Sequence, residues 1–116
     1  MNLKTSYDLV KDQIQMNCAS PLKEAALLLN DCVAEYIYNF CYEYDRNSLS
    51  MIKFLRETDF DENKHGYVTP LDVVFDAIEQ RRPELTRLYR IFRLAPASLQ
   101  REAVCVLAYY YSTAMH

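Results

Sequence analysis

The chain of 116 residues contains a single glycine, Gly66, and this shortage excludes several classes of enzyme. Loops that cradle a phosphate and elbows that expose a nucleophilic serine both need glycine beside the reacting group. Ser98 and Ser112 have no such glycine near them, and no motif surrounds the two histidines, His65 and His116. Catalysis by paired carboxylates is the one route that the sequence leaves open. We expect a protein that is not an enzyme and that holds no cofactor.

Paired cysteines and long apolar runs are also missing. The four cysteines, Cys18, Cys32, Cys41 and Cys105, form no CxxC pair and lie mostly on the apolar faces of expected helices. This pattern is typical of reduced core cysteines in an intracellular protein. The N-terminal residues lack the apolar run of a signal peptide, and no apolar segment reaches eighteen residues. We therefore expect a soluble protein without membrane contact.

The charge balance argues against a protein that binds nucleic acid through bulk positive charge. The formal net charge is −3 and the sequence pI is about 5.3. Residues 1–75 carry seven Lys and Arg against twelve acidic residues, whereas residues 76–116 carry six Arg against four. The Arg row within residues 81–101 either contacts phosphates or forms a solvated face that pairs with Glu84 and neighbouring glutamates. Nucleic acid is not expected to be the main ligand.

The most apolar stretch of the chain predicts one long helix over residues 20–44. Ser20 suits the capping position, Pro21 suits the first helical position, and no further glycine or proline interrupts the stretch. Apolar residues take up roughly two thirds of the helix circumference, which is more than an ordinary surface helix buries. The narrow stripe left for water holds Glu24, Asp31, Glu35 and Asn39. Such a helix needs packing partners on several sides.

Apolar residues at helical spacing predict five further helices, and no segment alternates apolar and polar residues as a strand does. The expected helices cover residues 6–16, 48–58, 70–81, 83–92 and 97–115. In the helix over residues 83–92, the expected inward residues are Leu85, Leu88, Tyr89 and Phe92, and the expected outward residues are Arg87, Arg90 and Arg93. The predicted fold class is all-α, with residues 1–116 forming a single helical domain.

Tyrosine is unusually frequent, with ten residues in the chain. Tyr38 and Tyr42 lie beside the polar stripe of the long helix, and residues 109–111 place three tyrosines around the last helix. Tyrosine combines a large contact area with a polar tip and is enriched at protein interfaces. The sequence therefore favours a protein partner.

The loop before residue 70 overlaps the pattern of a calcium-binding EF-hand. Asp61, Asn63 and Asp72 fall at positions one, three and twelve of such a loop, and Gly66 falls at the sharp turn. His65 occupies a position where a calcium ion needs an oxygen ligand, and Asp72 replaces the longer glutamate that binds through both oxygens. The alternative is a plain turn between two helices. Calcium binding is therefore a weaker hypothesis than a role without metal.

Two segments resemble the histone-fold family. The middle of the long helix is similar to that of the CCAAT-binding-factor group, where acidic, small, aliphatic, glutamate and aromatic–isoleucine positions follow in this order. The matching residues here are Asp31, Cys32, Val33, Glu35, Tyr36 and Ile37. The segment after Gly66 resembles the histone-fold subunits of the general transcription factor TFIID and of the SAGA coactivator. Its matching residues are Asp72, Val73, Val74 and Phe75.

The resemblance covers residues 6–94, with gaps, and implies a short-long-short helix arrangement of histone-fold type. The segment over residues 45–61 departs from the family as an inserted short helix, and two additional C-terminal helices complete the expected fold. A histone fold pairs its long helix with that of a partner, which implies a heterodimer in a nuclear transcription-regulatory complex. The implied partner interface consists of Leu29, Val33, Tyr36, Ile37 and Phe40, with Val73, Val74 and Phe75 closing over them.

A second interpretation does not depend on the resemblance. A small cytoplasmic helical adaptor or inhibitor, for example one of microbial origin, would bury the same apolar surface in a homodimer or on an unrelated target. The partner is then a second copy or another protein, in place of a second histone-fold subunit. The acidic residues within 59–63 would repel phosphate, so both interpretations concern protein assembly and not the packaging of DNA.

Overall fold

The computed structural model describes residues 3–40, 48–57 and 70–114, and in 48–50, 57 and 70–73 it describes the backbone alone. Its elements are α1 (Leu3–Asn17), α2 (Leu22–Phe40), α3 (Ser48–Glu57), α4 (Pro70–Arg81), the 3-10 turn η2 (Pro83–Leu85), α5 (Thr86–Leu94) and α6 (Ala97–Ala114). These residues contain no strand, which confirms the all-α class. The short-long-short arrangement is not established by this order of elements.

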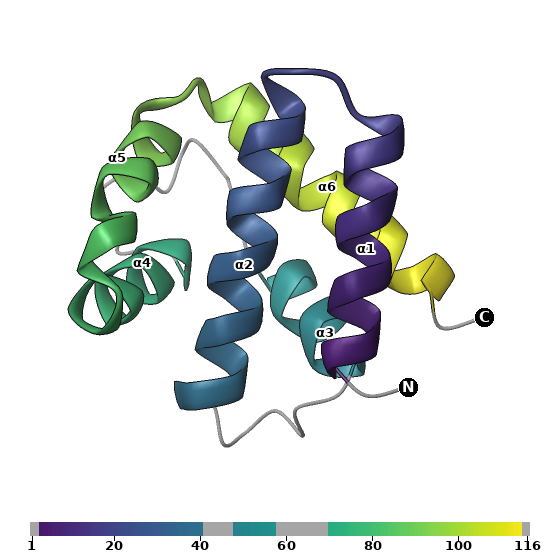
Figure 1. The fold of residues 1–116 in the computed structure, drawn as a ribbon, viewed down its shortest axis with the longest axis horizontal. Coiled ribbons are helices and arrows are strands. Elements are labelled where there is room, and N and C mark those ends of the chain that lie inside the picture. The colour runs from purple at the N-terminus through teal and green to yellow at the C-terminus, as the bar shows by residue number, and fades with distance from the viewer. Residues whose placement is uncertain (1–2, 41–47, 58–69, 115–116) are drawn as a thin grey trace.

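The first two helices form an antiparallel hairpin, and α2 stands at the centre of the molecule (Figure 1). The apolar stripe of α1 recurs at helical spacing, and Val10 and Ile14 from this stripe are completely buried against the core. The α2 helix buries residues on several sides, as its composition predicts. Its most buried apolar residues are Ala26, Leu29, Cys32, Val33 and Ile37.

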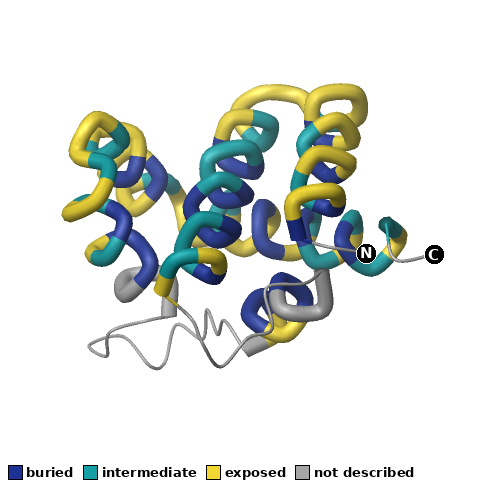
Figure 2. Tube along the Cα trace, turned by 60° about the horizontal axis from the view of Figure 1, so that its bottom comes forward, coloured by how far each residue is buried: buried dark blue, intermediate teal, exposed yellow. Residues whose placement is uncertain are grey.

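The last helix crosses behind the hairpin and closes its open side (Figure 1). It contacts α1, α2 and α3, and it contributes Ala103, Leu107 and Tyr111 as completely buried residues. The α3 helix packs against α6 through the core, with Met51 and Leu55 buried. Buried segments of the helices face one another across this centre, as Figure 2 shows in dark blue. The chain therefore covers much of α2 with its own helices.

The α4 and α5 helices form the remaining side of the molecule, beside α2 (Figure 1). On α4, Val74, Phe75 and Ile78 are buried. The ring of Phe75 stacks on Tyr89 with 5.4 Å between centroids and meets Phe92 edge-on at 5.5 Å. Such aromatic pairs each contribute about 0.5–1.5 kcal/mol beyond the burial of their area. This cluster fixes α5 on α4 by one of its faces.

Helix boundaries agree with the sequence in several places and differ in others. The expected helices over 70–81 and 97–115 are present as α4 and α6, and the separate short helix expected in 48–58 is present as α3. The long helix begins at Leu22, and the Ser20 hydroxyl, predicted to cap its first turn, donates to the Glu24 carboxylate. Its predicted extension over residues 41–44 lies outside the described residues.

Two predictions for the residues after Arg82 are wrong. Pro83 opens a short 3-10 turn, and the α-helix begins only at Thr86. Leu88, predicted to face inward, has 45% of its surface exposed, whereas Tyr89 and Phe92 are the buried residues of α5 and contact Phe75 of α4. A further correction concerns Cys105, which is exposed and not a core residue.

The contribution of α6 to the core generates a prediction about stability. Leu107→Ala removes a completely buried side chain from the contact between α6 and its neighbours. We expect the free energy of unfolding to fall by about 2–5 kcal/mol, measured by urea denaturation of the purified chain. Cys105→Ala, on the exposed side of the same helix, is the matched control and should change this value by less than about 0.5 kcal/mol. Equal effects of the two substitutions would contradict the position of α6.

Candidate functional site

Two residues of the polar stripe predicted for α2, Asp31 and Glu35, contact neighbouring elements, and so does the adjacent Asn30. The side-chain oxygen of Asn30 accepts a hydrogen bond from the Tyr111 hydroxyl of α6. One position further, the Asp31 carboxylate accepts a hydrogen bond from the Tyr7 hydroxyl of α1. Asn30 is completely buried and Asp31 is partly buried. The α6 and α1 helices are therefore each tied to α2 by a tyrosine hydroxyl.

A third polar residue of α2 holds the junction between α4 and α5. The Glu35 carboxylate accepts a hydrogen bond from Nη1 of Arg82 at 3.1 Å, and Nε of Arg81 lies 3.7 Å from it. Arg82 also donates through Nε to Glu84 at 2.9 Å, as the sequence predicted for this part of the Arg row. The pKa of the guanidinium is raised by its hydrogen bonds to Glu84 and then Glu35. Arg82 therefore stays a cation between two carboxylates.

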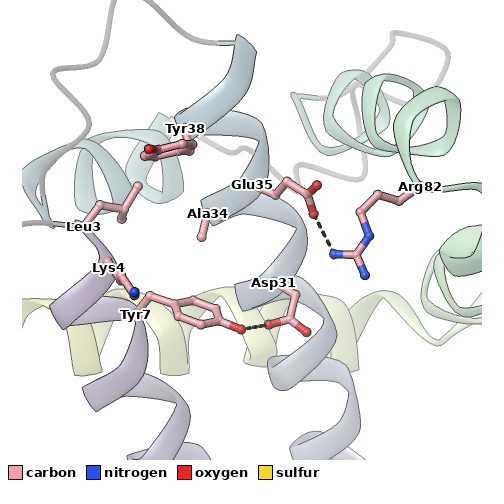
Figure 3. Close-up of a pocket in the computed structure, with 8 residues that line it drawn as sticks. All are labelled: Leu3, Lys4, Tyr7, Asp31, Ala34, Glu35, Tyr38 and Arg82. Atoms are coloured by element: carbon pink, nitrogen blue, oxygen red, sulfur yellow. Dashed lines mark hydrogen bonds and ion pairs between the residues drawn. The ribbon is translucent and has the colours of Figure 1, made fainter.

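These contacts surround a cleft between α1 and α2 with a volume of about 550 Å³ (Figure 3). Its lining residues are Leu3, Lys4, Tyr7, Asp31, Ala34, Glu35, Tyr38 and Arg82. The pKa of Tyr7 is raised by burial and by the hydrogen bond to Asp31, so its hydroxyl stays protonated and acts as a donor. Each of the two carboxylates already accepts a hydrogen bond from a protein group. The cleft therefore offers positioned polar contacts but no activated nucleophile.

A second surface lies on the other side of α2, where α5 and the start of α6 approach its first half. The α5 groove, as we name it, has a volume of about 520 Å³. It is lined by Ser20, Pro21, Glu24, Ala25, Leu27, Leu28, Asp31, Leu85, Leu88, Ile91, Phe92, Ala95 and Leu99. Most of these side chains are aliphatic, in contrast to the cleft beside α1.

One wall of the α5 groove exposes large apolar side chains. Leu88 is 45% exposed, Ile91 is 59% exposed and Leu94, at the end of the same helix, is 86% exposed. Contiguous apolar surface of this kind marks sites of interaction in soluble proteins. The stripe at i, i+3 and i+6 is visible in the sequence, but the sequence predicted only one apolar face for this helix.

The residues of the implied partner interface lie at different depths. Leu29, Val33 and Ile37 are completely buried within this chain, and Val74 and Phe75 are buried beside them. A partner would reach these five residues only if helices of the same chain moved away. Their role in pairing stays a prediction.

Two aromatic residues of the same predicted set lie nearer the surface. Tyr36 is partly buried, and Phe40 is 41% exposed and stacks on Tyr36 with 5.9 Å between ring centroids. The side chain of Val73 lies outside the described residues. Of the predicted interface, the end of α2 at Phe40 is the part that solvent reaches most.

The metal and cation hypotheses have different outcomes. Asp61 and Asn63, and the side chain of Asp72, lie outside the described residues, and within the described part of the chain no three metal-ligating side chains cluster. Arg93 pairs with Asp76 at 3.9 Å, so part of the Arg row is neutralised within the chain. None of the helices among residues 3–40, 48–57 and 70–114 is long and apolar enough to span a membrane.

Comparison of the chain with protein-family models, with curated proteins and with solved structures finds no match. The proposal for its function therefore rests on two surfaces beside α2. In the cleft next to α1, polar side chains of the lining already form hydrogen bonds and an ion pair with one another. The α5 groove presents aliphatic side chains that the described residues leave exposed. Of the two surfaces, the α5 groove is the one where covering apolar side chains would be more favourable.

The contrast between two cysteines generates a prediction about reactivity. Burial raises the pKa of the Cys32 thiol to about 12, whereas Cys105 is exposed. Because the thiolate is the reactive form, iodoacetamide at pH 8 should modify Cys105 within minutes and leave Cys32 intact. Peptide mapping by mass spectrometry after a timed quench gives both rates, and the same reaction in 6 M urea should remove the difference. Equal native rates would show that the centre of α2 is open.

The buried tyrosines generate a prediction about pH. Burial raises the pKa of Tyr7, Tyr89 and Tyr111 above the ordinary phenol value of about 10. Above pH 10 the unfolded chain releases phenol protons that the folded chain retains, so the free energy of unfolding falls as the pH rises. Below pH 10 both states keep these protons, and the contribution of the tyrosines to stability is fully present. Urea denaturation at pH 8 and pH 11 measures the loss, and Tyr111→Phe should lessen it. Equal or greater stability at pH 11 would contradict this assignment.

Proposed function

We propose that this protein is a non-enzymatic interaction module that binds a partner protein through the α5 groove. The observation that carries the proposal is the exposed apolar stripe of Leu88, Ile91 and Leu94 beside a groove of about 520 Å³. Burying apolar surface contributes about 25 cal/mol for each Å² removed from water. A partner that covers this stripe would gain that contribution, whereas no described helix of the chain does so.

The packing of α2 supports a module that folds by its own helices. Leu29, Val33 and Ile37 are buried by neighbouring helices of the same chain. This favours a folded helical adaptor or inhibitor that docks on a target through the α5 groove, and not through the apolar surface of α2 that the sequence suggested. The groove then acts as the recognition surface, and α2 acts as the scaffold on which α5 and α6 are held.

A histone-fold heterodimer in a nuclear transcription-regulatory complex is the second candidate. It is favoured by the exposed aromatic end of α2, where Tyr38 is 57% exposed beside Phe40. In this arrangement a partner helix would cross α2 near that end, beside the contact of α4 with α2. The candidate requires the buried face at Val33 to open, which the adaptor does not require.

Site-specific photocrosslinking in cells tests the proposed binding surface. The substitution Ile91→p-benzoyl-phenylalanine places a photoreactive group in the α5 groove, and we expect it to form covalent adducts with another protein. Tyr109→p-benzoyl-phenylalanine is the matched control, because Tyr109 is 65% exposed and lies on α6 away from the groove lining. Adducts from position 109 and none from position 91 would overturn the proposal.

The two candidate functions also differ in the behaviour of the isolated chain. An adaptor that folds by itself should be soluble, with one cooperative thermal transition and a constant mass in light scattering. A subunit that needs a histone-fold partner should be insoluble alone and rescued by co-expression with that partner. Photocrosslinks from Phe40→p-benzoyl-phenylalanine, and none from position 91, would favour the heterodimer.

A further inference from the structure

We propose that the cleft beside α1 is a binding site for a small organic cation, a primary ammonium group carried on an apolar or aromatic body. This site does not depend on the proposed docking of a protein in the α5 groove. Three features of the cleft carry the proposal: a partly buried carboxylate that forms no ion pair within the described residues, tyrosine side chains beside it, and apolar residues between them.

The charged residues of the cleft consist of one internal pair and two single charges. Glu35 and Arg82 form the pair, with 3.1 Å between the carboxylate and the guanidinium. No ion pair joins Asp31 or Lys4 to another described residue. Asp31 is partly buried, whereas Lys4 is exposed. Because water and salt screen an exposed charge more than a partly buried one, Asp31 determines which sign of ligand charge the cleft favours.

The Asp31 carboxylate can accept further hydrogen bonds. It accepts one from the Tyr7 hydroxyl (Figure 3), and no other described residue donates to it. An ionised carboxylate offers about four acceptor positions on its two oxygens. Burial raises the pKa of Tyr7, so the phenol is a neutral donor that brings no opposite charge to Asp31. An ammonium group supplies both several N–H donors and that opposite charge.

The rest of the lining suits the apolar body of such a ligand. Asp31, Ala34 and Tyr38 follow one another at three- and four-residue intervals, which places them along one face of α2. Leu3 and Tyr7 complete the lining from α1 (Figure 3). Tyrosine rings also attract cations through the negative face of the ring. The volume of about 550 Å³ lies within the range of roughly 300–1,000 Å³ that is typical of small-molecule sites.

An anionic ligand fits the same cleft less well. The charge of Arg82 is already shared between Glu35 and Glu84, at 3.1 Å and 2.9 Å, so an approaching anion meets these carboxylates as well. Lys4 is the remaining cation of the lining, and an exposed ion pair contributes little to binding. An anion also brings a like charge next to Asp31, which is unfavourable.

Three small molecules of matched shape test the preference for a cation. Phenethylamine, 2-phenylethanol and 3-phenylpropionate each carry a benzene ring on a two-carbon chain, and they end in an ammonium, a hydroxyl and a carboxylate at pH 7. Titration of the full chain, followed by amide shifts in NMR, should move Lys4, Tyr7 and Ala34 and leave Thr113 unchanged. Phenethylamine should bind about tenfold more tightly than 2-phenylethanol, because a hydrogen bond to a charged group is stronger than a neutral one. 3-Phenylpropionate should bind most weakly.

The substitution Asp31→Asn tests the residue that selects the charge. Asparagine keeps the oxygen to which Tyr7 donates, so the contact between α1 and α2 and the thermal transition should be retained. The affinity for phenethylamine should fall about tenfold, to that for 2-phenylethanol. Asp12→Asn is the matched control, because Asp12 is exposed on α1 and does not line the cleft. It should leave the affinity unchanged.

Two further variants locate the bound amine, because Asp31 also lines the α5 groove. Ala34 lines the cleft and not the groove, so Ala34→Leu should fill the cleft and weaken the binding of all three molecules. Ile91 lines the groove and not the cleft, so Ile91→Ala should leave phenethylamine binding unchanged. A loss in Ile91→Ala with full binding in Ala34→Leu would place the amine in the α5 groove and overturn the proposed site.

Other outcomes would also overturn the site. They are the absence of saturable phenethylamine binding, binding of 2-phenylethanol or 3-phenylpropionate as tight as that of the amine, and an unchanged affinity in Asp31→Asn. If a variant does not fold, the shifts in the unmodified chain decide, and shifts confined to residues outside the cleft would contradict the proposal. Photocrosslinking from position 91 tests the proposed function separately, so either proposal can fail without the other.

Discussion

The burial of α2 on most of its circumference is the constraint on which the rest of the structure depends. A helix with Ala26, Leu29, Cys32, Val33 and Ile37 completely buried has no single face that water can solvate well. Each buried Leu, Ile or Val contributes about 1.5–3 kcal/mol relative to an exposed one, so every side of α2 that is covered stabilises the whole chain. α1, α4 and α6 each cover one side (Figure 1). The other helices are therefore arranged around α2, and each covers a different part of its surface.

The polar atoms within this core determine how the helices are positioned more than they add to stability. A typical internal hydrogen bond contributes only about 1 kcal/mol net to stability, because the same polar groups form hydrogen bonds with water in the unfolded chain. The Asn30 amide nitrogen and the Ser6 hydroxyl are buried and have no hydrogen-bond partner within the described residues, which reduces the gain further. The contacts of Asn30 with Tyr111 and of Asp31 with Tyr7 are directional, however, and fix the rotation of α2 relative to α6 and α1. Apolar burial alone leaves that rotation open.

Local features of the sequence predicted the helices well and the surfaces poorly. Pro70 and the period of the following apolar residues determine α4, and the same kind of period determines α6, because both signals lie within the segment itself. The contacts of Tyr7 with Asp31 and of Arg82 with Glu35 join residues 24 and 47 positions apart, and they depend on how helices cross. The exposure of Leu88 also depends on a crossing, since Tyr89 and Phe92 compete with it for the surface of α4. The helical period of a sequence identifies its apolar faces, but it does not show which of two apolar faces is buried in the fold.

The two apolar faces of α5 explain why the groove exists before any partner binds. A helix of nine residues is too short to be stable in water by itself, so α5 depends on the face that packs on α4. Tyr89 and Phe92 satisfy that requirement through Phe75, and the ion pair between Glu35 and Arg82 holds the turn that leads into the helix. The second face, with Leu88 and Ile91, is thereby presented in a fixed position next to α2. A partner that binds there does not have to order the wall that it contacts, and a preformed wall lowers the entropic cost of association.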